Sequence, residues 1–207
     1  MIVEFVGPNG SGKATIIDEL SRQLTNRGEA AETVSFRSTN VSLWQGLRNN
    51  PALARKVIRG PILTRRMRVI VRRDAMLQRL PATTRTLVDE GPRHGLMSLA
   101  ASGQLSDIKE HLAALREPDI IVAMQADITV LLPRLRRKHD RHWSHDYNDM
   151  RLTERLARYL AIQDDFVRRT PIPVVYCANG PGSLTETATA LLDDLLQLES
   201  QLRRSSQ

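Results

Sequence analysis

The sequence predicts a single three-layer α/β/α domain, in which helices cover both faces of a parallel sheet. Short apolar runs alternate along the chain with longer stretches of helical periodicity, which is typical of buried parallel strands joined by helices. The first of these runs leads straight into a glycine-rich turn and then into a helix. A chain of 207 residues is long enough for one sizeable core and short for two, so we expect 1–207 to form one domain.

The expected strands are short and rich in aliphatic residues. They are residues 2–6, 33–36, 86–88, 120–124 and 173–177. Residues 13–26 carry apolar side chains at helical spacing and end at Arg27-Gly28, a helix-stop signal. We expect Asp127 to cap a later helix, and the last helix to run from about Leu184 to a tail that frays from Arg203.

The composition is that of a soluble, basic protein. Hydrophobic residues make up 41% of the chain, and no apolar run reaches the roughly 18 residues that a membrane helix needs. The first strand begins at Ile2, which leaves no room for a cleavable signal peptide, and Cys177 is the single cysteine. We therefore expect a cytoplasmic protein without membrane contact or internal disulfide. The net charge of +7 favours a nucleotide, a phosphorylated substrate or nucleic acid as partner.

The turn after the first strand carries the strongest functional signal. It reads Gly7-Pro8-Asn9-Gly10-Ser11-Gly12-Lys13 and fits the pattern G-x-x-x-x-G-K between a strand and a helix. Glycines let the backbone curl so that its N–H groups point at phosphate oxygens, and the following helix adds its positive end. Lys13 would reach the β- and γ-phosphates. The motif therefore predicts that the chain binds ATP.

The residue after this lysine departs from the usual pattern. A Ser or Thr there would place its hydroxyl on Mg²⁺, but the chain has Ala14 followed by Thr15. This loop resembles the G-K-G-T loop of adenylate kinases. The resemblance implies that Thr15 makes a phosphate contact or a water-mediated metal contact. It also implies that Mg²⁺ is coordinated mainly by the nucleotide and by water.

Two carboxylates end the third expected strand, where ligands gather in open α/β sheets. Asp89 and Glu90 could hold Mg²⁺ or accept the proton of an attacking hydroxyl. Gly91-Pro92 then turns the chain, so that Arg93 is predicted to clamp a phosphate and His94 to lie near the same cleft. The alternative for this strand end is a helix cap with a solvated glutamate.

A run of cationic residues follows the fourth strand. Arg134, Arg136, Arg137 and Lys138 precede a polar stretch without strand character, so we expect residues 134–150 to form a lid that closes guanidinium groups onto phosphates. Some of these charges could instead serve a solvated helix face. His139, His142 and His145 recur every three residues, but no cysteine or established carboxylate spacing supports a zinc site.

Residues 42–80 are predicted to be helical and carry ten basic side chains against one acidic residue, Asp74. The basic residues are Arg48, Arg55, Lys56, Arg59, Arg65, Arg66, Arg68, Arg72, Arg73 and Arg79. One or two of them could bind the phosphate of an acceptor, which places an acceptor-side region at about 38–82. A nucleic-acid surface is the other functional interpretation, although Trp44 is the only aromatic residue there.

Together these motifs resemble the nucleoside-monophosphate kinase group, and within it the thymidylate-kinase-like branch. The resemblance covers nearly the whole chain and includes the glycine loop, the Asp89-Glu90 strand end and the arginine helix before the lid. It implies a P-loop kinase fold with five parallel strands in the order 2-3-1-4-5. It also implies that Arg134 and Arg137 lie near ATP, and that Ala178 and Asn179 border its base.

The acceptor side matches this family less well. Arg37, a candidate substrate ligand, is followed by Ser38-Thr39 where the family has Glu-Pro. We therefore expect a divergent member that moves the γ-phosphoryl group of ATP to a small acceptor, most readily a nucleotide or nucleoside. The alternatives are a kinase of a non-nucleotide metabolite, a kinase of a modified base in DNA, and a non-catalytic nucleotide-binding switch or slow ATPase. A homodimer remains open as an assembly.

Overall fold

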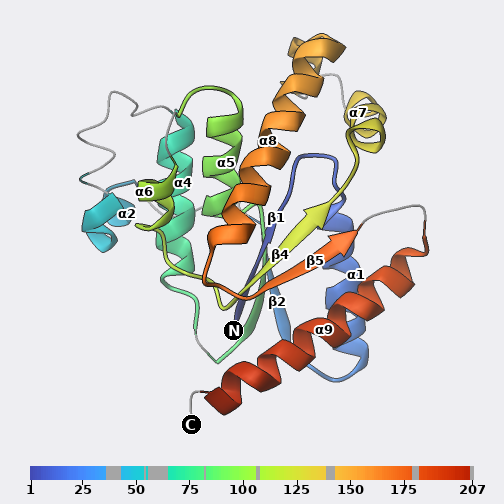
Figure 1. Cartoon of the computed structure of the whole chain (residues 1–207). Coiled ribbons are helices and arrows are strands. Elements are labelled where there is room, and N and C mark those ends of the chain that lie inside the picture. Colours follow the sequence, from blue (N-terminus) through green and yellow to red (C-terminus); the bar gives the residue numbers. More distant parts are fainter. Residues whose placement is uncertain are drawn as a thin grey trace.

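The computed structural model describes residues 1–35, 43–53, 55, 65–81, 83–105, 108–138, 143–178 and 182–205. A parallel sheet lies between two layers of helices, with the strands in the order β2-β3-β1-β4-β5 (Figure 1). The strands are β1 (Ile2–Val6), β2 (Ala31–Ser35), β3 (Arg85–Asp89), β4 (Ile120–Gln125) and β5 (Val174–Ala178). Both the α/β/α layering and the order 2-3-1-4-5 were predicted, and the structure confirms them.

The strand ends differ from the predicted ones by one or two residues. The third strand was expected to end at Val88, but Asp89 still pairs with Ser35 of β2, so β3 continues for one residue more. Phe36, the expected end of β2, lies outside the described residues. In the same way β5 starts and ends one residue later than expected, because Ala178 is in register with Gln125 of β4.

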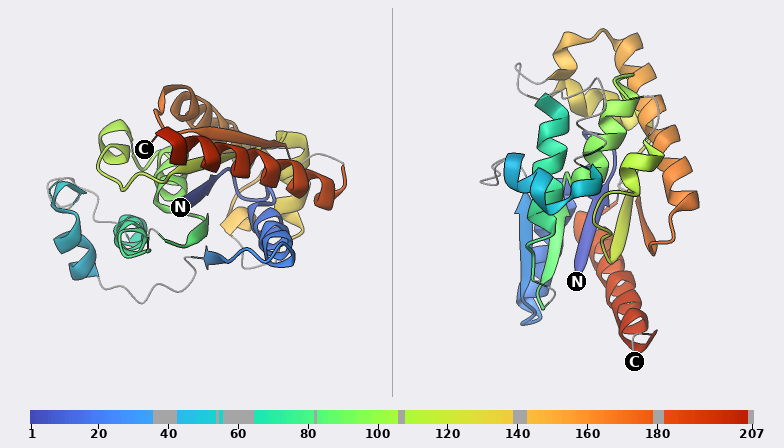
Figure 2. Two further views of the ribbon diagram at one scale, coloured as in Figure 1. Left: turned by 90° about the horizontal axis from the view of Figure 1, so that it is seen from below. Right: turned by 90° about the vertical axis from the view of Figure 1, so that its left-hand side faces the viewer.

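The helices surround the sheet and extend beyond its carboxyl end (Figures 1 and 2). They are α1 (Lys13–Asn26), α2 (Leu43–Asn49), α4 (Arg65–Leu77), α5 (Pro92–Ala101), α6 (Lys109–Leu112), α7 (Ile128–Arg136), α8 (Asp149–Arg169) and α9 (Leu184–Ser205), with a 3₁₀ turn η1 (Trp143–Asp146). Asp127 caps α7 as predicted, since its carboxylate accepts the N–H of Thr129 at 2.8 Å. The tail expected to fray is helical to Ser205, and Arg203 pairs there with Glu199.

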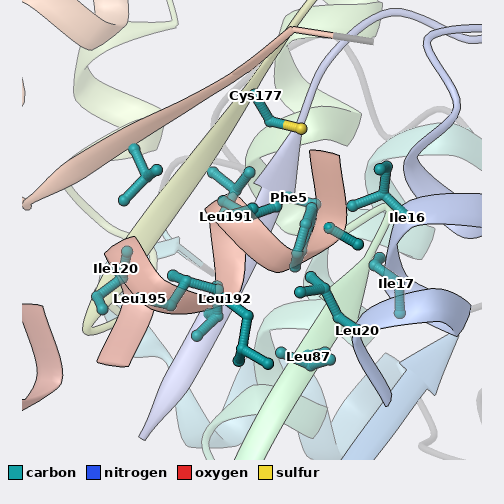
Figure 3. Close-up of a cluster of buried hydrophobic side chains, with 14 of the residues drawn as sticks. Phe5, Ile16, Ile17, Leu20, Leu87, Ile120, Cys177, Leu191, Leu192 and Leu195 are labelled. Carbon is teal, nitrogen blue, oxygen red and sulfur yellow. The ribbon is translucent and has the colours of Figure 1, made fainter. Parts of the chain in front are cut away.

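One face of the sheet packs against α1 and α9. Phe5 of β1 lies among the aliphatic side chains of these two helices (Figure 3). The same cluster holds Cys177 of β5, and burial raises the pKa of its thiol to about 11. This apolar layer fixes α1, and therefore the loop that precedes α1, relative to the strands.

The opposite face packs against α5 and α8, and α4 lies beside α5, where Leu77 packs on Val34 and Val88 of the sheet. Ile70 and Val71 of α4 pack with Leu96 and Leu99 of α5. The two helices approach closely at Gly95, where an added Cβ would lie 2.7 Å from Cγ1 of Ile70. This contact brings α4 close to the end of β3, where Arg73 lies 3.7 Å from Glu90.

A buried ion pair joins β1 to the start of α5. Glu4 is completely buried and accepts the backbone N–H of Arg93 at 3.0 Å and its guanidinium at 2.9 Å. The guanidinium, which is 2% exposed, also donates to the carbonyl of Arg116 at 2.8 Å. Gly91 leaves room for this pair, since an added Cβ would lie 2.2 Å from the Glu4 carboxylate. The pair therefore sets the path of the turn after β3.

We expect Arg93→Met to lower the free energy of unfolding by about 3–5 kcal/mol, because it leaves the Glu4 carboxylate buried without its charged partner. Urea denaturation measures this change. Arg203→Met is the matched control, because its guanidinium is exposed and Glu199 keeps a second cationic partner in Arg85, so the expected loss is about 1 kcal/mol or less. Equal small losses for both variants would contradict the structural role of Arg93.

Candidate functional site

The glycine loop joins β1 to α1 at the carboxyl end of the sheet (Figure 1). Gly10 and Gly12 have φ values of 88° and 87°, a left-handed conformation that side chains disfavour. Gly7 lies so close to β4 that an added Cβ would be 2.7 Å from Cβ of Met124. The glycines of the motif therefore serve the curl of the backbone and its close packing. Gly10 also faces Leu135 of α7, so the loop lies beneath that helix.

Lys13 is folded back onto this loop. Its Nζ donates to the carbonyls of Gly7 at 2.8 Å and Pro8 at 3.1 Å, and the side chain is buried. Burial lowers the pKa of Lys13 to about 8, although the carboxylates of Asp89 and Glu90 favour its charged form. Ala14 and Thr15 follow on the first turn of α1 and are exposed. The charge of Lys13 is thus held among backbone acceptors at the position where the motif predicts phosphates.

The two predicted carboxylates lie at the end of β3, within the electrostatic reach of Lys13. Glu90 has a φ of 52°, a left-handed conformation that is strained for a residue with a side chain. Its carboxylate lies 3.7 Å from the guanidinium of Arg73 on α4. Burial lowers the pKa of Arg73, and the charges of Glu90, Asp89 and Glu4 oppose this. Arg73 therefore lies beside the two carboxylates, whereas the sequence alone did not distinguish it from the other basic residues of 42–80.

Arg93 lies away from its expected place, whereas His94 lies beside the glycine loop as expected. The predicted phosphate clamp, Arg93, points into the interior toward Glu4, because the buried carboxylate offers it a charged partner. His94 is buried on α5, with its Nδ1 2.8 Å from the hydroxyl of Tyr159 on α8. Burial, together with the charges of Lys13 and Arg73, holds the pKa of His94 well below its usual value.

The predicted lid is tied together by one of its arginines. Arg136 donates to Asp149 at 2.9 Å, to the carbonyl of Ser144 at 2.9 Å and to the carbonyl of Tyr147 at 2.8 Å. These bonds connect the end of α7 to η1 and to the start of α8, above the carboxyl end of the sheet (Figure 2). Arg136 therefore fixes the described part of the lid, and its guanidinium is engaged within it.

The other lid cations face outward from α7. Arg134 is half-buried, whereas Arg137 and Lys138 are exposed. The charge of Lys138 contributes to the lowered pKa of Lys13, which places this end of α7 near the loop. Residues 139–142 lie outside the described part of the chain, and two of the three lid histidines with them. Among the described residues there is no cluster of three His, Cys, Asp or Glu side chains that could hold a metal ion.

Sequence reasoning missed Arg155 on α8. Its side chain is buried, its guanidinium lies 5.4 Å from the ring centre of Tyr147, and it donates to the Tyr147 hydroxyl at 3.1 Å. Burial lowers the pKa of Arg155, and the nearby charge of Arg66 acts in the same direction. A cavity of about 20 Å³ separates Arg155 from the loop residues Pro8 and Asn9. The four-residue spacing of Arg155 and Tyr159 was the available signal, since it places both on one face of a helix.

Of the remaining predicted residues, only Ala178 lies in the described part of the chain. Ala178 ends β5 and is exposed beside the carboxyl end of β4. Asn179 and Arg37 fall outside the described residues, so their predicted contacts with base and acceptor stay predictions.

No helix within the described ranges is both long enough and apolar enough to cross a membrane.

The donor atoms of the cleft fit a magnesium ion that a nucleotide brings with it. Carboxylate and hydroxyl oxygens are the ligands that Mg²⁺ prefers. Asp89 and Glu90 supply carboxylates near Lys13, and Thr15 carries an exposed hydroxyl on the first turn of α1. Ala14 has no oxygen to offer on its side chain. Two carboxylates and one hydroxyl are too few for a complete coordination shell, so phosphates and water would supply the rest.

The strand order and the loop between β1 and α1 define the P-loop kinase fold. No family model matches the sequence, and no curated protein matches it. The fold is similar to that of deoxyadenosine kinase from M. mycoides with bound dATP, at a TM-score of 0.62 and 13% identity over 94% of this chain and 99% of that one. It is also similar to shikimate kinase from Acinetobacter baumannii in complex with shikimate, at a TM-score of 0.54 and 18% identity over 95% and 93% of the two chains.

We expect ATP binding to weaken as the pH rises through about 8, because Lys13 then loses its charge. The bound phosphates favour the charged amine, so ATP should raise this pKa and be bound with uptake of a proton near pH 8. Calorimetric titrations in buffers of different ionisation enthalpy measure both effects.

The control is Lys13→Arg, whose guanidinium stays charged throughout this pH range. It should bind ATP without the alkaline decline. An identical decline in both proteins would assign the titration to another group.

We expect Glu90→Gly to raise the free energy of unfolding by about 0.5–1 kcal/mol, because glycine adopts the left-handed conformation without strain but loses more entropy on folding. Urea denaturation measures this change. Glu90→Gln is the matched control, since it keeps the strained backbone and removes only the charge. A gain of the same size in both variants would show that charge repulsion, and not backbone strain, is relieved.

Proposed function

We propose that the chain is an ATP-dependent phosphotransferase that acts on a small acceptor, most readily a nucleotide or nucleoside. The observation that carries this proposal is the cluster of opposite charges around the glycine loop. Lys13 lies on the loop, Asp89 and Glu90 face it from β3, and Arg73 approaches Glu90 from α4. A site that only held ATP would use one carboxylate for Mg²⁺, and it would not need the second carboxylate and second cation that Glu90 and Arg73 supply.

The loop and its lysine would hold the triphosphate. On binding, Lys13 would leave the carbonyls of Gly7 and Pro8 and pair with the β- and γ-phosphates. Arg134 and Arg137 would approach the phosphates from α7, and Ala178 with Asn179 would border the base. Mg²⁺, when bound, would neutralise phosphate charge, with Asp89 and Thr15 holding it through water or directly. Lys13 and the arginines would stabilise the charge that spreads over the transferred group.

The acceptor would lie between β3 and α4. Its oxygen attacks the γ-phosphorus in line, the bond from that phosphorus to the bridging oxygen of ADP breaks, and ADP leaves. A hydroxyl acceptor passes its proton to Glu90, whereas a phosphate acceptor needs no base. Arg73 would orient the acceptor or its phosphate, and Arg155 would face the transferred group across the cavity beside Pro8 and Asn9. Arg37 is a further candidate acceptor ligand.

The kinases of similar fold support this proposal in part. Deoxyadenosine kinase was solved once with dATP and once with the products dCMP and dCDP. Shikimate kinase was solved with shikimate, which is not a nucleotide. Because the fold carries both kinds of acceptor, a nucleotide and a non-nucleotide metabolite both belong in the test. A kinase of a modified base in DNA is the third acceptor class.

A nucleotide-binding switch is the second candidate function. Ala14 favours it, because the position that usually binds Mg²⁺ through a hydroxyl carries only a methyl group. The carboxylates and the arginines of α4 and α8 favour the transferase. The two candidates differ in one respect, since only the transferase makes ADP faster when an acceptor is present.

We expect ATP-to-ADP conversion with Mg²⁺ to depend on one acceptor class when nucleoside monophosphates, nucleosides, shikimate-like alcohols and duplex DNA are each supplied. Glu90→Gln should slow transfer to a hydroxyl by about 100- to 10,000-fold and leave transfer to a phosphate nearly unchanged, since only the hydroxyl must lose a proton. Coupled ADP release and product mass spectrometry measure both. Lys13→Ala is the inactive control. ATP binding without acceptor-dependent turnover across the panel would favour the switch.

A further inference from the structure

The hydroxyl of Tyr159 lies between two groups that belong to other elements. It accepts the backbone N–H of Gly7 at 3.2 Å and lies 2.8 Å from Nδ1 of His94. All three groups are buried, and Tyr159 is only 4% exposed. One oxygen atom of α8 thus joins the first residue of the glycine loop to α5.

The direction of the proton in this bridge follows from the chemistry of its partners. The Gly7 N–H can only donate, so the phenol is the acceptor there. We assign the phenol proton to the bond with Nδ1 of His94, because a buried hydroxyl needs an acceptor for its own proton. In this assignment Nδ1 is unprotonated and the ring proton lies on Nε2. Lys13 from the loop side and Arg73 from α4 disfavour a charged ring. Burial keeps Tyr159 a phenol, because it raises the pKa of the hydroxyl.

Both backbone polar groups of Gly7 are hydrogen-bonded. Its N–H is bound by Tyr159, and its carbonyl accepts Nζ of Lys13 at 2.8 Å. The bridge therefore extends from His94 through Tyr159 and Gly7 to the lysine. When Lys13 leaves for a phosphate, the bond from the Gly7 N–H to Tyr159 still holds the start of the loop, together with the hydrogen bond between the His94 ring and the Gly7 backbone.

The same helix also carries a cation that lines the cavity beside this part of the loop. Arg155 precedes Tyr159 by one helical turn, and both line the cavity beside Pro8 and Asn9. At its start, α8 is bound through Asp149 to Arg136 of the lid helix α7. A rigid displacement of α8 would therefore move Arg155 and the anchor of Gly7 together.

We propose that Tyr159 is a positioning residue that fixes the glycine loop to α8. The loop amides and Arg155 then keep a fixed position relative to each other on the two sides of the transferred phosphoryl group. This proposal rests on the proposed function. Its physical reason is that phosphoryl transfer depends almost wholly on positioning, so that a displacement of about 1 Å can reduce the rate about 100-fold.

The test is Tyr159→Phe, which removes one oxygen atom and keeps the packed ring. The kcat for phosphoryl transfer should fall about 10- to 100-fold, whereas KM for the acceptor stays unchanged. The matched control is Tyr176→Phe on β5, whose side chain is 55% exposed and which should keep wild-type kcat. An unchanged kcat in Tyr159→Phe, or an equal fall in both variants, would overturn the proposal.

The histidine side of the bridge provides a rescue experiment. His94→Leu removes the acceptor of the Tyr159 proton and should reduce kcat, whereas His94→Asn places an oxygen near the position of Nδ1 and should restore most of it. The double variant Tyr159→Phe with His94→Leu should lose no more than the worse single variant, because both act through one bridge. Full additivity of the two losses would overturn the coupling.

A measurement without turnover separates this proposal from the proposed function. Hydrogen exchange of the Gly7 amide, followed by NMR, should accelerate in Tyr159→Phe and stay slow in Tyr176→Phe. Accelerated exchange in a chain that transfers no phosphoryl group would disprove the proposed function and leave the bridge intact. Unchanged exchange would disprove the bridge itself, whatever the activity.

Discussion

The ion pair of Glu4 and Arg93 is the contact on which the geometry of the cleft depends. A carboxylate in the middle of a central strand is costly to bury, and its cost is offset only if a cation reaches it with good geometry. Arg93 does so at the first turn of α5, and this fixes where that helix begins. Gly91 must pass close to the carboxylate, and Glu90 just before it takes a left-handed conformation. The strained residue beside Lys13 is thus the consequence of an interaction within the core.

The sequence predicted those parts of the site that lie next to one another along the chain. β1, the glycine loop and α1 were located to the residue, because their signals are local: an apolar run, glycines at fixed offsets and a helical period. Asp89 and Glu90 were likewise predicted from the end of a strand. The strand order came from a resemblance, since nothing local in the sequence specifies which strands become neighbours.

The parts that were missed are side chains brought in by the packing of helices. Arg73 is one cation among many on α4, and only the packing of Ile70 against α5 turns that face toward Glu90. Arg155 and Tyr159 sit in the middle of a long amphipathic helix, where an arginine and a tyrosine would usually be read as surface and core. Arg93 shows the opposite error. A charged residue after a Gly-Pro turn was expected in the cleft, and a buried partner on β1 drew it inward.

Cys177 gives the folded state a reporter of its own. The single thiol lies between β5 and the helix α9, in the apolar layer that fixes α1 and the glycine loop (Figure 3). With its pKa raised to about 11 and its sulfur buried, it reacts with alkylating reagents only when that layer opens. The rate of thiol labelling in the unmodified chain therefore measures how often α9 separates from the sheet. No cysteine has to be engineered or removed for this measurement, because the chain contains no second thiol.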